Sequence, residues 1–187
     1  MEYIIIIAFI AVVILLFAGK YNRLVTLRNR GKNAWSQIDV RLQQRNDLIP
    51  NLVNTVKGYA KHESQTLERV IQARNQLMAA QSEDNVKEAA KAENHLQSTL
   101  KSLFALRESY PDLKANTNFL DLQEKLKGME DKLASVRQYY SDSVTRYNTE
   151  IEKFPANLIA SMFGFKPMEL FEVENEEVRK APKVEFD

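Results

Sequence analysis

The chain begins with an unbroken apolar stretch. Residues 3–19, YIIIIAFIAVVILLFAG, contain no charged or strongly polar side chain. As a helix they would be ~25 Å long at about 1.5 Å per residue, just enough to cross the hydrocarbon core of a bilayer. We therefore predict a transmembrane anchor at residues 1–19. A cleaved secretory signal is the alternative, but Met1-Glu2 is not basic and no small-residue cleavage site follows.

Beyond the anchor, apolar residues recur at spacings of three and four, which is typical of amphipathic helices. Pro50 lacks the N–H that would bond the carbonyl four residues earlier, so we expect a kink at this position or a break. The strongest periodic pattern runs over five heptads, from Phe119 to Phe154. The pattern predicts helices at about residues 20–61, 64–80, 85–108 and 112–153.

Helix lengths and short connections limit the topology. The first and fourth helices would each span ~60 Å, and the second and third ~25 and ~35 Å. Short connections make sequential helices antiparallel. We therefore predict an all-α protein in which the transmembrane helix is followed by an antiparallel four-helix bundle with long first and fourth helices. The expected domains are the anchor at 1–19, the bundle at 20–153, a short apolar or amphipathic segment at 154–171 and a flexible acidic tail at 172–187.

Charge is unevenly distributed along the chain. The formal net charge is only +1, which removes the basic excess expected of a nucleic-acid binder, but residues 20–45 hold seven basic residues and one acid, a local charge of +6. By the positive-inside rule this places the N-terminus outside and the bundle in the cytoplasm. The same charge could instead bind anionic lipid headgroups. The membrane-flanking basic residues are Lys20, Arg23, Arg28, Arg30 and Lys32.

Several chemistries lack sequence support. The chain has no cysteine, which excludes disulfides, thiol nucleophiles and zinc ribbons, and its five glycines are too dispersed for a phosphate-binding loop. His62-Glu63 lacks the second histidine of a zinc protease helix, and neither histidine has a glutamate three residues before it. We therefore expect no metal, no cofactor, no catalytic residue and no enzymatic activity; a hydrolase using helical carboxylates is a minor alternative.

Two groups of residues are candidates for function or for buried polar structure. The first is polar residues in or beside the seams, which need hydrogen-bond partners if buried: Arg45, Arg74, Asn75, Tyr140 and Tyr147. We interpret them as a layer that sets helix register, with a partner-binding groove as the alternative. The second group is candidate partner contacts around the proline and in the apolar segment: Arg45, Asp47, Pro50, Asn51, Phe154, Pro155, Asn157, Phe163 and Phe165.

Ordered motifs identify a resemblance that covers nearly the whole chain. The most specific are NAWSQIDV at 33–40, RNDLIPNLV at 45–53 and VKGYAKHE at 56–63, followed by ARN at 73–75, YN at 147–148, FPANLI at 154–159 and FGF at 163–165. With these motifs the chain resembles the LemA family of bacterial membrane-anchored helical proteins. The resemblance implies a short external N-terminus, one membrane helix and a helical bundle. It implies a fold and a location, not an activity.

These observations lead to two main hypotheses about function. The first is a non-enzymatic, single-pass membrane scaffold or adaptor whose bundle contacts a protein partner or a second copy of itself, because long seams can pair between chains as well as within one. The second is an organiser of anionic lipid surfaces that uses the basic residues and the Phe-rich segment. The expected partners are the bilayer and a protein, and not nucleic acid.

Overall fold

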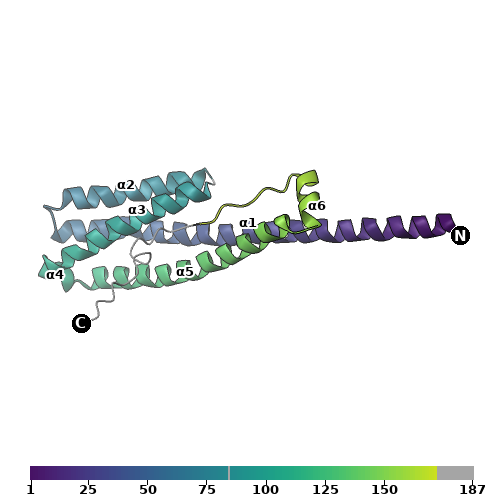
Figure 1. Ribbon diagram of the computed structural model, residues 1–187. Helices are drawn as coiled ribbons and strands as arrows, with labels where there is room; N and C mark the ends of the chain where they lie inside the picture. Colours follow the sequence, from purple (N-terminus) through teal and green to yellow (C-terminus); the bar gives the residue numbers. More distant parts are fainter. Residues whose placement is uncertain (84, 172–187) are drawn as a thin grey trace, which may run out of the picture. The chain divides into compact units, whose positions relative to one another are not determined.

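A computed structural model describes residues 1–83 and 85–171 (Figure 1). The described residues are helical, with no strand among them, which confirms the prediction of an all-α protein. The predicted acidic tail at 172–187 lies outside the described residues. The elements are α1 (Glu2–Tyr59), α2 (Ser64–Ser82), α3 (Val86–Ala105), the 3-10 turn η1 (Leu106–Glu108), α4 (Pro111–Lys114), α5 (Thr117–Glu152) and α6 (Ala156–Phe163).

Helix α1 contains the predicted anchor. Its N-terminal part is the one stretch of the described residues that is long and apolar enough to cross a membrane, and none of that stretch is buried within the protein. The first fully buried apolar side chain along α1 is Leu24. Side chains in the apolar stretch are therefore available to lipid, and packing against the rest of the chain begins after it.

Helix α1 continues without a break through Pro50. A proline at this position leaves the carbonyl of Asn46 without its usual N–H donor from four residues later. The guanidinium Nε of Arg74, on α2, donates a hydrogen bond of 2.9 Å to this carbonyl. Because a buried backbone carbonyl without a partner is costly, this side chain compensates for what the proline removes. Of the kink and the break considered for Pro50, the break is therefore absent.

The chain divides into two compact units, and the division falls inside α1 and α5. The first unit comprises residues 1–45 and 126–170, and the second contains residues 46–125. In the first unit, buried apolar positions recur at helical spacing on both long helices, as the seams predicted. They are Leu24, Ala34, Ile38 and Leu42 on α1, and Leu126, Leu133, Tyr140, Val144, Tyr147 and Ile151 on α5.

In the second unit α2 packs against α3, and α2 also contacts the last part of α1. The amide of Asn46 donates to the side chain of Gln81 near the end of α2, at 3.1 Å. Two hydrogen bonds connect the segment after α3 with the end of α1 and the turn that follows it. The Tyr110 hydroxyl donates to Glu63 at 3.1 Å, and the Asn116 amide donates to the Tyr59 hydroxyl at 2.8 Å. The apolar interior comes mainly from Leu67, Val70, Ala73, Leu77, Ala89, Leu96, Leu100, Leu103 and Phe119.

The region between α3 and α5 differs from the prediction. A single helix was expected over residues 112–153, but α4 ends at Lys114 and α5 begins at Thr117. The physical reason is a cap: the Asn116 side chain accepts a hydrogen bond of 2.9 Å from the backbone N–H of Phe119, as an asparagine at a helix N-cap does. Asn85 caps α3 in the same way, through the N–H of Glu88 at 3.1 Å.

The pairing of Arg74 with the Asn46 carbonyl yields a testable prediction. Arg74→Ala should lower the free energy of unfolding by about 1–3 kcal/mol, because it leaves that carbonyl without a donor. The same substitution should cost less in a Pro50→Ala background, where residue 50 again supplies an N–H to that carbonyl. Chemical denaturation of the full-length protein in an uncharged detergent, followed by circular dichroism, measures both differences.

Arg69→Ala is the matched control, since Arg69 is an exposed arginine on the same helix and should change stability little. If Arg74→Ala lowers the free energy of unfolding equally in the presence of Pro50 and in the Pro50→Ala background, the proposed compensation is contradicted.

Candidate functional site

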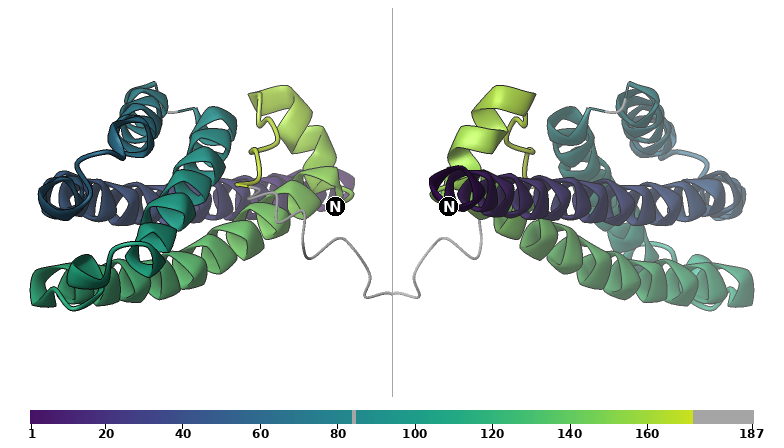
Figure 2. Two further views of the ribbon diagram at one scale, coloured as in Figure 1. Left: turned by 90° about the vertical axis from the view of Figure 1, so that its left-hand side faces the viewer. Right: turned by 90° about the vertical axis from the view of Figure 1, so that its right-hand side faces the viewer.

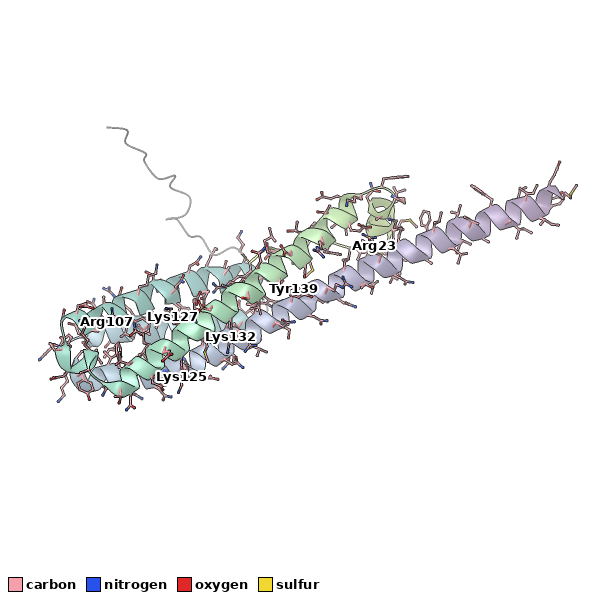
Figure 3. The ribbon with its side chains drawn as sticks, turned by 90° about the horizontal axis from the view of Figure 1, so that it is seen from below. Arg23, Arg107, Lys125, Lys127, Lys132 and Tyr139 are labelled. Atoms are coloured by element: carbon pink, nitrogen blue, oxygen red, sulfur yellow. The ribbon has the colours of Figure 1, made fainter. Side chains whose placement is uncertain are left out.

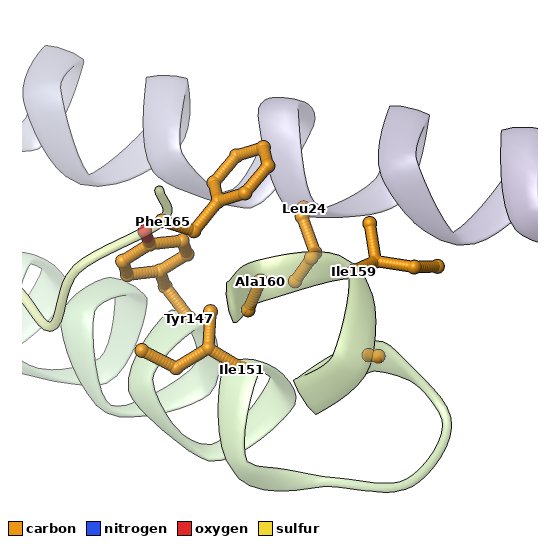
Figure 4. Packing of buried hydrophobic residues seen from close by; sticks show 7 residues of the cluster. Leu24, Tyr147, Ile151, Ile159, Ala160 and Phe165 are labelled. Carbon is orange, nitrogen blue, oxygen red and sulfur yellow. The ribbon is translucent and has the colours of Figure 1, made fainter. Parts of the chain in front are cut away.

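The first unit is held together immediately after the apolar stretch by a cluster that includes α6. Leu24 of α1, Tyr147 and Ile151 of α5, and Ile159 of α6 meet there (Figure 4). Ala156, Ala160 and Phe165 complete the cluster. Figure 2 shows α6 lying across the direction of α1 instead of along it. The short helix is therefore fixed at the level of Leu24, just after the apolar stretch ends.

The opposite face of α6 is apolar and exposed. On α6, Met162 is 72% exposed, Phe163 58% and Leu158 49%, and Phe154, two residues before the helix begins, is 79% exposed. Phe163 also lies beside Tyr21 of α1, with ring centroids 4.9 Å apart. An exposed apolar face of this kind, next to a membrane-spanning stretch, is suited to contact with lipid or with another apolar surface.

Gly164 reverses the chain after α6. Its φ of +69° lies in the left-handed region that favours glycine, and the following N–H, of Phe165, bonds the carbonyl of Ala160 at 2.9 Å. This turn directs Phe165 inward, where it is only 7% exposed and lies against Tyr21 and under the Arg28 guanidinium, 4.8 Å from the ring centroid. The two phenylalanines of the FGF motif both lie beside Tyr21, but Phe163 is mostly exposed and Phe165 is buried.

Residues 165–170 form an extended segment, the C-terminal strap, which is fixed by hydrogen bonds to α5. The Asn148 side chain makes two bonds of 2.9 Å with the backbone of Met168, donating to its carbonyl and accepting from its N–H. The hydroxyls of Tyr140 and Tyr147 donate to the carbonyls of Glu169 and Lys166, at 2.7 and 2.9 Å. Gly31 of α1 allows close approach, because a Cβ there would lie 2.8 Å from the Met168 Sδ.

Burial raises the pKa of Tyr147 above its usual value of 10.0, and the nearby Arg28 charge opposes this effect. A raised pKa means that the folded state holds the phenol proton more tightly than the unfolded state does. The contribution of the protonated Tyr147 phenol to the free energy of unfolding is fully present below pH 10.0, the pKa in the unfolded chain. It is lost as the pH rises through the raised pKa of the folded state. The neutral hydroxyl is the form that donates to the strap, so the hydrogen bond and the protonation state are consistent.

Two carboxylates of α5 neutralise basic side chains within the first unit. Glu130 accepts from the buried Arg45 at 2.8 Å and from Arg137 at 3.1 Å. Glu150, itself 5% exposed, contacts Lys20 at 3.5 Å and Arg23 at 3.1 Å. Sequence reasoning missed both carboxylates, since glutamates on an amphipathic helix usually face solvent. Spacing alone does not distinguish them, because every position of an amphipathic helix lies within about one turn of a seam residue.

The structure separates the predicted contact residues by their exposure. Asp47, Asn51, Phe154, Asn157 and Phe163 are exposed, and Pro50 and Pro155 are half-buried. For Arg45 and Phe165 the prediction of an accessible contact residue is corrected, because both are buried. Arg45 is in an ion pair with Glu130, and Phe165 belongs to the α6 cluster. The physical reasons are local, since Arg45 occupies a seam position of α1 and the turn at Gly164 directs Phe165 inward.

The predicted polar layer is also divided. Tyr140 and Tyr147 are fully buried and bond the strap, whereas Arg74 is half-buried and bonds the Asn46 carbonyl in the other unit. For Asn75 the prediction of burial is corrected, because the residue is exposed. Its side chain accepts a hydrogen bond of 3.4 Å from Arg74. These four residues therefore do not form one buried layer, and each of the buried or half-buried members satisfies a backbone carbonyl.

The membrane-flanking basic residues occupy different environments. Lys20 and Arg23 pair with Glu150, Arg28 lies over Phe165, and Arg30 and Lys32 are exposed. Both histidines, His62 and His95, are exposed, and residues 1–83 and 85–171 contain no group of three or more His, Asp or Glu side chains arranged to hold a metal ion.

These features define a class: an all-helical, membrane-associated protein with one membrane-crossing candidate helix and a packed unit directly after it. The chain belongs to the LemA family, whose model matches residues 34–186. It is 25% identical to the magnetosome proteins MamQ 1 and MamQ 2 of Paramagnetospirillum magneticum, over 89% of this chain and 68% of each relative. It is also 25% identical to Protein LemA of Metamycoplasma hominis, over 83% of this chain and 70% of that relative.

The two hydrogen bonds of Asn148 predict how the strap responds to mutation. Asn148→Ala should speed hydrogen exchange at the amide of Met168, because that N–H loses its acceptor. Hydrogen-exchange mass spectrometry of the full-length protein measures the effect over residues 165–170. Gln138→Ala, an exposed change on the same helix, is the control and should leave exchange in the strap unchanged. Equal exchange in both variants would show that Asn148 does not hold the strap.

Proposed function

We propose that this protein is a single-pass, membrane-anchored helical scaffold or adaptor of the bacterial inner membrane. The observation that carries the proposal is the continuity of α1, which joins the exposed apolar stretch to the packed first unit without a break. A continuous helix transmits the position of the anchor directly to the residues that follow it. Similarity to bacterial proteins named as magnetosome proteins is compatible with this proposal.

We propose further that the N-terminus lies outside and the rest of the chain in the cytoplasm. Arg28, Arg30 and Lys32 support this orientation, because their charges follow the apolar stretch and make no ion pair with a carboxylate among the described residues. Glu150 forms ion pairs with Lys20 and Arg23 and neutralises part of their charge. We also propose that residues 20–153 form an antiparallel four-helix bundle.

The exposed face of α6 is proposed to rest in the membrane interface. Tyr21, the neighbour of Phe163, lies only two residues past the apolar stretch, or ~3 Å along a helix. The exposed apolar residues of α6 would therefore lie at the depth of the headgroups, where amphipathic helices bury their apolar side. A second contact with the bilayer would restrict how the first unit can tilt and rotate on its anchor.

The surface proposed for the protein partner is the exposed side of α1 next to Pro50. Asn51 and Asn54 lie about one turn apart there, and both are exposed. Their side chains can change without disturbing the buried residues Ile49, Leu52 and Val53. The proposed partner is a protein or a second copy of this chain.

Topology can be tested directly because the chain has no cysteine. Ser82 is exposed at the end of α2, so Ser82→Cys introduces one accessible thiol. A membrane-impermeant maleimide should label this variant only after cell lysis if the bundle is cytoplasmic. Labelling of intact cells, with a known cytoplasmic thiol protein still protected, would place the bundle on the outer side and overturn the proposed orientation.

The partner surface can be tested by photo-crosslinking in living cells. A photoreactive phenylalanine analogue at Asn51 should give an adduct of defined mass, while the same analogue at Lys87, an exposed residue of α3, should not. Asn54→Arg should abolish the adduct without reducing helix content, because it places a bulky charge on the same exposed face. An adduct at both positions, or one insensitive to Asn54→Arg, would rule out this surface; an adduct of twice the chain mass would identify a second copy.

A further inference from the structure

A groove lined by positive charge lies between α1 and α5 in the first unit. Its volume is about 480 Å³, within the range of small-ligand sites. Arg23 and Arg30 of α1 lie two turns apart on one wall, and Arg146 and Lys153 of the α5 side lie two turns apart on the other. Figure 3 shows Arg23 in the part of α1 that runs beside the end of α5.

Most of these basic side chains form no ion pair among the described residues; Asp142, which lines an adjoining pocket with Arg30 and Arg146, accepts a hydrogen bond from Gln138. Glu150 is the carboxylate that lines the groove, and it is engaged by Arg23 and Lys20. Arg30, Arg146 and Lys153 are exposed and form no ion pair with residues 1–83 or 85–171. Holding several like charges around one concave surface is unfavourable unless an anion lies between them.

The groove also presents neutral hydrogen-bond donors. Thr145, just before Arg146, and Thr149, between Arg146 and Lys153, line the α5 wall. Arginine forks and hydroxyl groups together match the oxygens of a phosphate, which accepts several hydrogen bonds and carries negative charge. A carboxylate ligand would offer fewer oxygens, and a nucleic acid would need a longer basic surface than this groove provides.

We propose that the groove binds a phosphate group, with Arg30, Arg146 and Lys153 as its ligands. The source is an anionic lipid headgroup or a soluble phosphorylated compound, and the lipid source rests on the proposed membrane anchoring. Arg23 lies ~6 Å along the helix from Gly19 and Arg30 ~16 Å from it, so the groove begins at headgroup depth and extends away from the bilayer. The end of the groove near Arg23 and Lys153 is therefore at headgroup depth, and Arg30 and Arg146 lie about two helical turns farther from the bilayer.

The test uses the full-length protein in an uncharged detergent, titrated with inorganic phosphate and, separately, with short-chain phosphatidylglycerol, by calorimetry. Arg30→Gln combined with Arg146→Gln should weaken binding of the phosphate probe about tenfold or more, because two charge-assisted contacts are lost. The matched control is Lys127→Gln with Lys132→Gln, which removes the same charge from exposed positions of α5 (Figure 3) and should change affinity by about twofold or less. Helix content, measured by circular dichroism, should be equal in all forms.

The two probes distinguish the source of the phosphate. Phosphatidylglycerol binding that is lost in the groove variant, with weak binding of inorganic phosphate, identifies a lipid headgroup site. Comparable groove-dependent binding of inorganic phosphate identifies a soluble phosphorylated ligand. Equal losses in the groove and control variants, or equal binding of diacylglycerol that lacks a phosphate, would overturn the proposal. These results do not depend on the topology experiment, so failure of the two proposals can be told apart.

Discussion

The need to pair buried backbone polar groups determines much of this structure. Helix α1 contributes to both compact units, and Pro50 would interrupt its hydrogen bonding at the carbonyl of Asn46. Arg74 donates to that carbonyl and allows the helix to continue. The same requirement explains the C-terminal strap, which has no regular secondary structure and whose backbone is paired with side chains of α5.

The polar seam residues are thus bonded mainly to backbone and not to one another. Tyr140 and Tyr147 contribute apolar rings to the core and hydroxyls to the strap, which is how tyrosine is normally accommodated when buried. Asn148, beside Tyr147 in the family motif, completes the arrangement through two bonds to Met168. Met168 of the strap packs against the cluster that contains Ile159 and Ala160 of α6.

Some charged side chains of the first unit form ion pairs between its helices, and others are exposed to solvent. Glu130 and Glu150 neutralise arginines and a lysine close to the seams, and these pairs are partly removed from solvent. Arg30, Arg146 and Lys153 remain exposed around the groove between α1 and α5. The basic segment after the anchor is therefore not uniform: part of it holds the helices together, and part faces outward, where it can orient the protein in a membrane or bind an anion.

The sequence by itself determined the helical class, the apolar stretch and the buried faces of α1 and α5, because these follow from composition and from the 3.6-residue period. It also identified Tyr140 and Tyr147 as polar residues that need partners if buried. Only the tertiary structure decided which partners they have, that α1 continues through Pro50, that Arg45 and Phe165 are buried, and that Glu150 contacts Lys20 and Arg23. The physical reason is that periodicity shows which face of a helix is covered, whereas the hydrogen bonds and ion pairs on that face depend on residues distant in the chain.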